Sequence, residues 1–225
     1  MSDYSRLAEF VVPARATPDL RRVVSVAVLL ILAFYALVPA ALGLVVPASR
    51  NDSADWINSY SAAILEYLAF GIVLAVLAHG LRRFHGRGIA SVFGPAAWFW
   101  ADLRRGFIGA ALAMLLFEVI PPYFWTGDAF LSWPVPLWLL SLPISMAAIL
   151  IQVVTEEAIF RGYLQQQLAV LRPSRLVWMW LPSLAFGALH YGSGFGQVDG
   201  VINVIWATAL GLACADLTAR SGNLG

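Results

Sequence analysis

Long apolar runs constrain this chain more than any other feature. They cover residues 22–48, 60–80, 106–125, 137–164, 175–191 and 198–219. A helix needs about 20 apolar residues to cross the ~30 Å hydrocarbon core of a bilayer, and most of these runs reach that length. The sequence therefore predicts an all-α, polytopic membrane helical bundle with about six spanning helices.

The composition agrees with this fold class and excludes several kinds of function. Hydrophobic residues make up 60% of the chain, charged residues 12%, and the mean hydropathy is +0.78, which is outside the range of a soluble domain. The net charge of +1 comes without a basic stripe, which excludes a nucleic-acid partner. All 14 basic residues are arginines, so a Schiff-base lysine mechanism is excluded, and the single Cys214 excludes an intrachain disulfide.

The arginines also predict the orientation and the division of the chain. Thirteen of the 14 fall on one predicted side of the membrane, and only Arg50 lies in a loop on the other side. Because cytoplasmic loops carry the excess of positive charge, we expect a multi-pass protein of the cell membrane, of the bacterial inner-membrane kind, with both ends in the cytoplasm. We expect a cytoplasmic arm at residues 1–21, N-terminal membrane helices at 22–135 and a functional core at 136–225.

Three charges stand close together inside the fourth apolar run. They are Glu156, Glu157 and Arg161. A charged side chain at the bilayer centre costs roughly 2.5 to 3.5 kcal/mol on insertion scales, so these side chains should pair, face a wet cavity or act in chemistry. On a continuous helix Glu157 and Arg161 are four residues apart and can form an ion pair, which leaves Glu156 for another role. The alternative is a helix end already solvated among cytoplasmic headgroups.

His190 lies in the fifth apolar run, one turn after Phe186 and away from any inner-loop arginine. The other two histidines, His79 and His85, lie beside inner-loop arginines, and we expect them to be solvated. A histidine in an apolar run is commonly a structural hydrogen-bond donor. With Glu156 in the same chain, however, a carboxylate and an imidazole are available to activate water or to hold a metal.

Four further polar residues lie in predicted spans. Glu118 precedes a pair of prolines and could line a wet vestibule, while Glu66 could satisfy a partner helix. Asn203 is a further candidate, and Asp216 is expected to be solvated near the inner face.

Taken together, the motifs resemble those of a known family. The pattern Glu156-Glu157-x-x-x-Arg161, its continuation through Leu164, and a later Phe186-x-x-x-His190 occur in order within apolar runs. This resembles the intramembrane CAAX prenyl protease and bacteriocin-processing family, CPBP or Abi, over roughly residues 140–225. The first motif is quite specific, whereas the second would be weak alone.

The resemblance implies an intramembrane endopeptidase that cleaves membrane-anchored peptides or proteins. It implies that Glu156 activates water, that Glu157 and Arg161 support it, and that His190 either helps bind a metal or stabilises the oxyanion. A divalent metal such as zinc, if present, would be held by Glu156 and His190. The residues expected to line the substrate cavity are Phe160, Phe186, Glu118 and Asn203.

One departure from the family pattern concerns the end of the chain. The family has a further helix with a His-x-x-x-Asn or His-x-x-x-Asp motif after a small polar turn, and the chain stops at such a turn, residues 220–225. We expect a fragment that lacks this seventh helix; the alternative is an incomplete, inactive relative.

The depths of the two central residues present a difficulty. Counted from the outer end of the fourth run, Glu156 lies about 22 Å along its helix, and His190 lies about 22 Å from the inner end of the fifth. They would then differ in depth by over ~10 Å in a ~30 Å core. We predict that a tilt, a break before Glu156 or a kink at Pro182 brings their side chains within about 10 Å.

Two rival functions remain open from the residues alone. In a membrane immunity or scaffold protein, the same polar side chains would hold helices together. In a small transporter, Glu66, Glu118 and Glu156 would form a relay.

Overall fold

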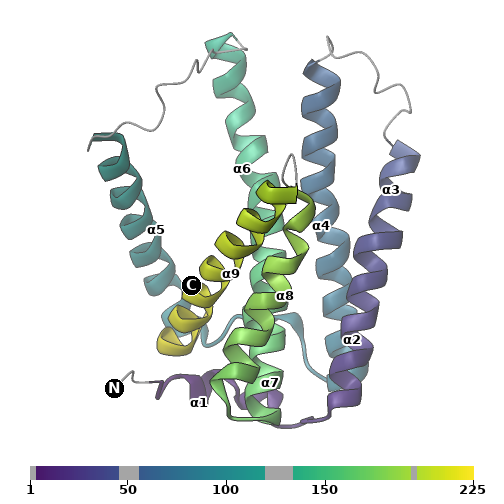
Figure 1. Cartoon of the computed structure of the whole chain (residues 1–225), viewed down its shortest axis with the longest axis vertical. Coiled ribbons are helices and arrows are strands. Elements are labelled where there is room, and N and C mark those ends of the chain that lie inside the picture. Colours follow the sequence, from purple (N-terminus) through teal and green to yellow (C-terminus); the bar gives the residue numbers. More distant parts are fainter. Residues whose placement is uncertain (1–3, 46–55, 120–133, 194–196) are drawn as a thin grey trace.

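The computed structural model describes residues 4–45, 56–119, 134–193 and 197–225, and within these ranges the regular structure is helical with no strand (Figure 1). This confirms the all-α fold class. The elements in chain order are α1 (Leu7–Phe10), the 3₁₀ turn η1 (Val12–Ala14), α2 (Leu20–Leu32), the π-helical segment η2 (Ala33–Leu37), α3 (Val38–Val45), α4 (Trp56–His85), the 3₁₀ turn η3 (Ile89–Val92), α5 (Ala96–Val119), α6 (Val135–Glu157), the π-helical segment η4 (Ala158–Leu164), α7 (Gln165–Leu171), the π-helical segment η5 (Leu176–Trp180), α8 (Leu181–Leu189), the 3₁₀ turn η6 (Tyr191–Ser193) and α9 (Gln197–Ser221).

Four stretches of the described residues are helices long and apolar enough to cross a membrane. They are Leu20–Val45, Tyr60–His85, Val135–Leu171 and Asp199–Ser221. The first joins α2, η2 and α3 without a break, and the third joins α6, η4 and α7. These helices make the chain a multi-pass membrane protein.

The other two predicted apolar runs do not form long apolar helices within the described residues. The run at 175–191 becomes the shorter apolar helix Leu176–Leu189, which rises only roughly 21 Å at 1.5 Å per residue. The run at 106–125 forms the second half of α5 as far as Val119, and the rest of it lies outside the described residues. A count of six spans is therefore larger than the number of long apolar helices in the described part of the chain.

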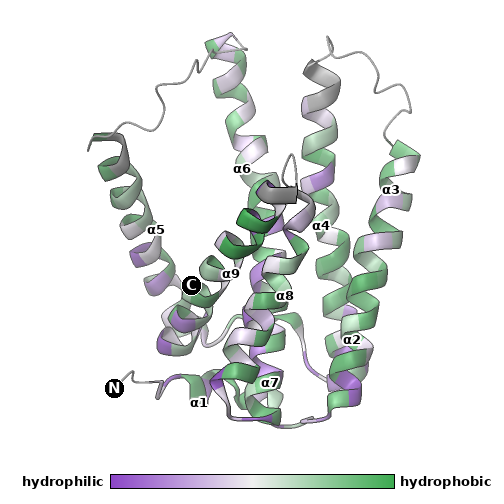
Figure 2. Cartoon of the chain, viewed as in Figure 1, coloured by the Kyte–Doolittle hydropathy of each residue, from purple (hydrophilic) through white to green (hydrophobic). Residues whose placement is uncertain are grey.

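One end of the bundle, here called the base, gathers α1, the start of α2, the end of α4 and the end of α7 (Figure 1). Arg82 and Arg83 lie in the last turn of α4, and Arg21 and Arg22 lie in the first turn of α2. Figure 2 shows hydrophilic colour at this end and hydrophobic colour along the shafts of the helices. This arrangement suits a bundle whose shafts lie in lipid and whose base lies at a polar interface.

The helix α4 packs against both α2 and α6, and the largest apolar core among the described residues joins α2, α4 and η4. Its fully buried members include Val26 on α2, Leu77 and Leu81 on α4, and Tyr163 on η4. The region around η4 is therefore fixed between the N-terminal and C-terminal parts of the chain.

The N-terminal arm folds along the base. Phe10 is 1% exposed, and the Tyr4 hydroxyl donates a 2.6 Å hydrogen bond to the Asp216 carboxylate on α9. The Arg6 guanidinium stacks 4.9 Å from the centre of the Trp98 ring on α5. The arm thus ties α5 and α9 together below the bundle.

The helices α8 and α9 form a close hairpin that turns over part way up the bundle, whereas α4 and α6 continue further (Figure 1). Small residues permit the close approach: a Cβ on Gly187 would lie 2.8 Å from the Val204 carbonyl oxygen, and one on Gly211 would lie 3.1 Å from Ser183 Cβ. His190, which ends α8 next to this hairpin turn, is half-buried.

Candidate active site

The predicted ion pair within the fourth run is present. Arg161 Nη1 lies 3.0 Å from Glu157 Oε1, and the Arg161 side chain is only 2% exposed. The angle of this contact does not make it a hydrogen bond, so neither Nη1 nor Nη2 of Arg161 has a hydrogen-bond acceptor among the described residues. The cluster therefore holds a buried cation with donor capacity left over, and the alternative of a fully solvated helix end is wrong for Arg161.

The helix changes its winding at this point. It passes from α6 into the π-helical segment η4 directly after Glu157, and η4 carries both Phe160 and Arg161. Such π-helical turns are rare and are often found at functional sites, because the extra residue redirects side chains. Here η4 buries Phe160 and Arg161 together.

Phe186 of α8 connects this segment to His190. Its ring lies 4.4 Å from the Arg161 guanidinium and packs edge-on against Phe160 at 5.2 Å between ring centres. Phe186 is itself 5% exposed, and its ring centre lies 4.6 Å from that of His190. The structure thus brings together Phe160, Arg161, Phe186 and His190, which come from two helices.

A count of residues places Glu156 and His190 at the same depth. Glu156 lies 15 residues before Leu171, about 22 Å above the lower end of α7, and His190 lies 14 residues after Leu176, about 21 Å above the start of η5. The contact between Arg161 and Phe186 supports this register. This count differs from the one made on the sequence because the fourth run continues as helix to Leu171, well beyond residue 164. The separation of the two side chains, expected within about 10 Å, stays a prediction.

The backbone determines which nitrogen of His190 carries the proton. His190 Nδ1 lies 2.8 Å from the carbonyl oxygen of Phe186. A carbonyl oxygen can only accept a hydrogen bond, so Nδ1 must carry the hydrogen and, in the neutral ring, Nε2 carries the lone pair. Neutral His190 can therefore accept a proton or a metal at Nε2, whereas donation from Nε2 to an oxyanion needs the doubly protonated ring.

Glu156 has a partner on its own helix. Gln152 Nε2 donates a 3.2 Å hydrogen bond to Glu156 Oε1 from one turn earlier on α6. Sequence reasoning missed Gln152, although an amide four residues before a carboxylate in the run Ile149–Val154 was a visible signal.

A metal centre is not completed by these residues. Within residues 4–45, 56–119, 134–193 and 197–225, no three histidine, cysteine, aspartate or glutamate side chains are grouped to hold an ion. Glu156 and His190 supply two donors, but a catalytic zinc needs three protein ligands. The described residues alone do not fit a zinc site, and we derive no catalytic step through a metal.

The two other predicted cavity residues are less defined. Asn203 is half-buried near the start of α9. Glu118 lies near the end of α5, and its side chain is outside the part of the chain whose side chains the structure describes. Their membership of the site stays a prediction.

A second polar group, here called the base network, lies below the site. It comprises Thr17, His85, Arg87, Tyr163, Gln166 and Gln167, together with the adjacent Gln165, which donates to the Ala215 carbonyl on α9. His85 is 4% exposed, with its Nε2 2.9 Å from the Tyr163 hydroxyl and its Nδ1 2.8 Å from the Thr17 hydroxyl. The expectation of a solvated His85 was wrong, because the arm and η4 close over it.

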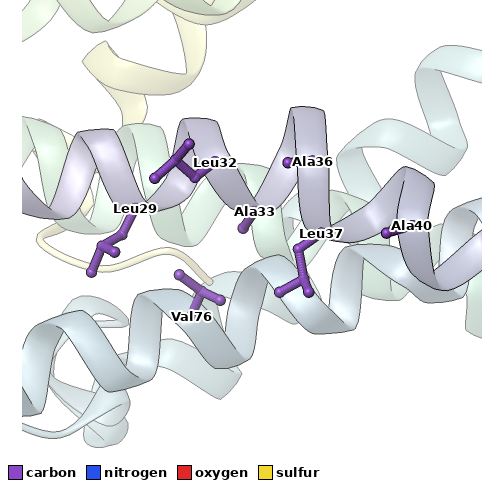
Figure 3. A pocket seen from close by; sticks show the side chains of 7 residues that line it. All are labelled: Leu29, Leu32, Ala33, Ala36, Leu37, Ala40 and Val76. Carbon is purple, nitrogen blue, oxygen red and sulfur yellow. The ribbon is translucent and has the colours of Figure 1, made fainter.

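An apolar hollow of about 430 Å³ lies between α2 and α4, beside the π-helical segment η2 (Figure 3). Its lining is entirely aliphatic: Leu29, Leu32, Ala33, Ala36, Leu37, Ala40 and Val76. It offers no acid, base or nucleophile. The polar cluster on α6, η4 and α8 supplies such groups, and we take it as the candidate active site.

Comparisons with known proteins agree with this location. Residues 136–225 match the family model of the type II CAAX prenyl endopeptidase Rce1-like proteins. No curated protein and no solved structure matches the chain. The matched segment contains Gln152, Glu156, Glu157, Arg161 and His190, and the match suggests an intramembrane CAAX-type protease. Residues 136–225 thus form an Rce1-like domain of the CPBP (Abi) family.

Proposed function

We propose that the chain is an intramembrane endopeptidase that cleaves membrane-anchored peptides or proteins near the bilayer surface or within the bilayer. The observation that supports the proposal is the contact between Arg161 and Phe186, which joins the helix of Glu156 to the helix of His190 inside the Rce1-like domain; a count of residues from this contact gives Glu156 and His190 a similar depth. A carboxylate and an imidazole at one depth in a mostly apolar site can act on the same water molecule.

In the proposed reaction Glu156 takes a proton from water as the water oxygen attacks the scissile carbonyl carbon. His190, with its proton held on Nδ1 by the Phe186 carbonyl, accepts a hydrogen bond from the same water at Nε2 and orients it. The tetrahedral intermediate collapses when the C–N bond breaks, and Glu156 returns its proton to the leaving amine. The products are a carboxylic acid and an amine; transfer of the acid proton to the amine then gives a carboxylate and an ammonium group, so atoms and charge balance.

Glu157 and Arg161 support this chemistry as a pair. Arg161 is held on one side by Glu157 and on the other by the Phe186 ring, and it brings the helix of Glu156 to the helix of His190. The aromatic side chains Phe160 and Phe186 exclude water below the reacting groups, which strengthens the electrostatic interactions there.

The proposed setting is the cell membrane, of the bacterial inner-membrane kind, with the arginine-rich base in the cytoplasm. We propose six membrane segments, in which α5 and the α8 hairpin accompany the four long apolar helices. In this arrangement residues 1–21 form a cytoplasmic arm, residues 22–135 form the N-terminal membrane helices, and residues 136–225 carry the chemistry.

The test is hydrolysis in proteoliposomes. The purified protein is mixed with a set of lipid-anchored peptides, and the products are identified by mass spectrometry. We expect cleavage by the wild type and a loss of at least ~10²-fold in Glu156→Gln. The matched control is Glu66→Gln on α4, a carboxylate in another membrane helix, which should keep its activity. Equal cleavage by wild type and Glu156→Gln would refute the assignment.

A further inference from the structure

We propose that Gln152 is a positioning residue for the Glu156 carboxylate; this rests on the proposed function. The Gln152 amide Nε2 donates to Glu156 Oε1 at 3.2 Å, and both side chains are half-buried on α6. A primary amide in an apolar run is costly to place in lipid. Its position needs a reason beyond filling space, and its contact with Glu156 supplies one.

The contacts of α6 show which face carries this pair. Thr155 donates a 3.3 Å hydrogen bond to the Phe70 carbonyl of α4, and a Cβ on Gly71 of α4 would lie 3.9 Å from Ile151. Ile151 and Thr155 therefore mark the face that packs on α4. Gln152 and Glu156 each lie one residue later, roughly 100° further round the helix, beside that contact and not within it.

The bond restricts the carboxylate in two ways. A donor on Oε1 fixes the rotation of the Glu156 side chain, and it leaves Oε2 as the oxygen available to take a proton from water. The bond also joins two residues four apart on one helix, so it adds little to the packing of α6 on its neighbours. Gln152 thus acts through Glu156 and does not touch the reacting atoms.

The experiment compares three substitutions at this position in the full chain in proteoliposomes. Gln152→Leu keeps the approximate volume and removes the donor. Gln152→Glu keeps the shape and replaces the donor with an acceptor, and Gln152→Asn keeps the amide on a shorter stem. We expect kcat to fall ~10- to 100-fold in the Leu and Glu variants and less in the Asn variant, with KM within about twofold of wild type.

A purely structural role predicts a different pattern. An apolar leucine suits a membrane helix, so if Gln152 only fills space, Gln152→Leu should keep its kcat and its melting temperature. The matched control is Ser145→Ala. Ser145 lies on α6 two turns before Gln152, and its substitution removes a 2.9 Å hydrogen bond to Tyr60 of α4. The control should lower the melting temperature and leave kcat unchanged. A wild-type kcat in Gln152→Leu would overturn the inference.

Failure of this inference is distinguishable from failure of the proposed function. If Glu156→Gln is inactive and Gln152→Leu is fully active, only the role of Gln152 is wrong; if Glu156→Gln is active, the proposed function is wrong. The contact can also be tested without activity. A double-mutant cycle of melting temperatures for Gln152→Leu and Glu156→Gln should give non-additive shifts, and additive shifts would contradict the bond.

Discussion

The two polar groups of this chain are bonded in opposite ways. In the candidate active site, Gln152 bonds Glu156, Glu157 pairs with Arg161, and His190 bonds the Phe186 backbone, and each contact spans four residues of the chain. In the base network the bonds join distant segments. His85 is hydrogen-bonded to the hydroxyls of Thr17 and Tyr163. Arg87 donates to Gln166 at 2.6 Å, and Gln165 donates to the Ala215 carbonyl at 2.9 Å.

This difference distinguishes polar groups that stabilise the fold from polar groups that take part in catalysis. Bonds between distant segments hold the arm, α4, η4 and α9 in place, so the base network does what a scaffold requires. Bonds within one helix do not join helices, and membrane hydrogen bonds average only about 0.6 kcal/mol. Arg161 does join two helices, through the Phe186 ring, so the scaffold alternative accounts for the base network and for Arg161 but leaves the Glu156 carboxylate without a purpose.

The largest effect expected from the comparison is on catalysis at His190. His190→Asn places an amide near the Nδ1 position, where it can still donate to the Phe186 carbonyl, but it removes Nε2. We expect the rate to fall ~10² to 10⁴-fold, the usual contribution of a positioned acid or base, with little change in melting temperature. Rates of peptide cleavage and thermal unfolding in detergent measure both. An active His190→Asn would show that Nε2 takes no part.

The next largest effect is expected on the stability of the fold, at η4, which carries residues of both polar groups. A Cβ on Gly162 of η4 would lie 2.8 Å from both Cβ and the carbonyl oxygen of Val92, and the backbone cannot yield easily. Gly162→Ala should destabilise the fold by about 1–3 kcal/mol, measured by thermal or denaturant unfolding. The control is Gly106→Ala on α5, where nothing lies within 4 Å of the added Cβ. Equal stability of Gly162→Ala and wild type would contradict the close packing.

A smaller effect is expected within the base network. Tyr163→Phe keeps the ring and removes the hydroxyl that lies 2.9 Å from His85 Nε2. Loss of one such bond should cost about 1 kcal/mol of stability and leave the rate of cleavage within about twofold. If the rate instead falls as far as in His190→Asn, the separation between the two regions fails.

The smallest expected effect is on thermal stability at low pH, through the contact between Asp102 and Asn223 in the C-terminal turn. The hydrogen bond from Asn223, with Arg105 nearby, holds the pKa of Asp102 below its ordinary value. A lowered pKa in the folded state means that the stabilisation is complete above the ordinary value, near 3.9, and is lost as the pH falls below it. The melting temperature should decline over this range in the wild type. In Asp102→Ala the additional decline should be absent.

Arg87 does not contribute to this acid effect. Burial lowers the pKa of Arg87 to about 10, yet the side chain stays charged at neutral pH. Its bond to Gln166 therefore persists over the range in which Asp102 titrates.

The candidate site could be predicted in part from the sequence, because helix periodicity acts over short distances. The spacing of Glu157 and Arg161 predicted their ion pair, and the apolar runs predicted an all-α bundle. The pairing of Glu156 with Gln152 follows from the same rule, and the sequence contains the signal for it.

Other features depend on tertiary contacts that spacing does not reveal. The burial of His85 needs Thr17 and Tyr163, which are far away in the sequence. The equal depth of Glu156 and His190 depends on where the helices end at the base, and a count from the outer boundary could not supply that end. The π-helical segment η4 likewise has no marker in the sequence.

The most direct test of the central claim is a joint measurement of rate and stability in Glu156→Gln. If Glu156 performs chemistry, peptide cleavage in proteoliposomes should fall by at least ~10²-fold. The melting temperature should stay equal or rise, because a neutral amide is easier to bury than a carboxylate. Cleavage within a few-fold of wild type, or a loss of cleavage that only follows a loss of folded protein, would contradict the account.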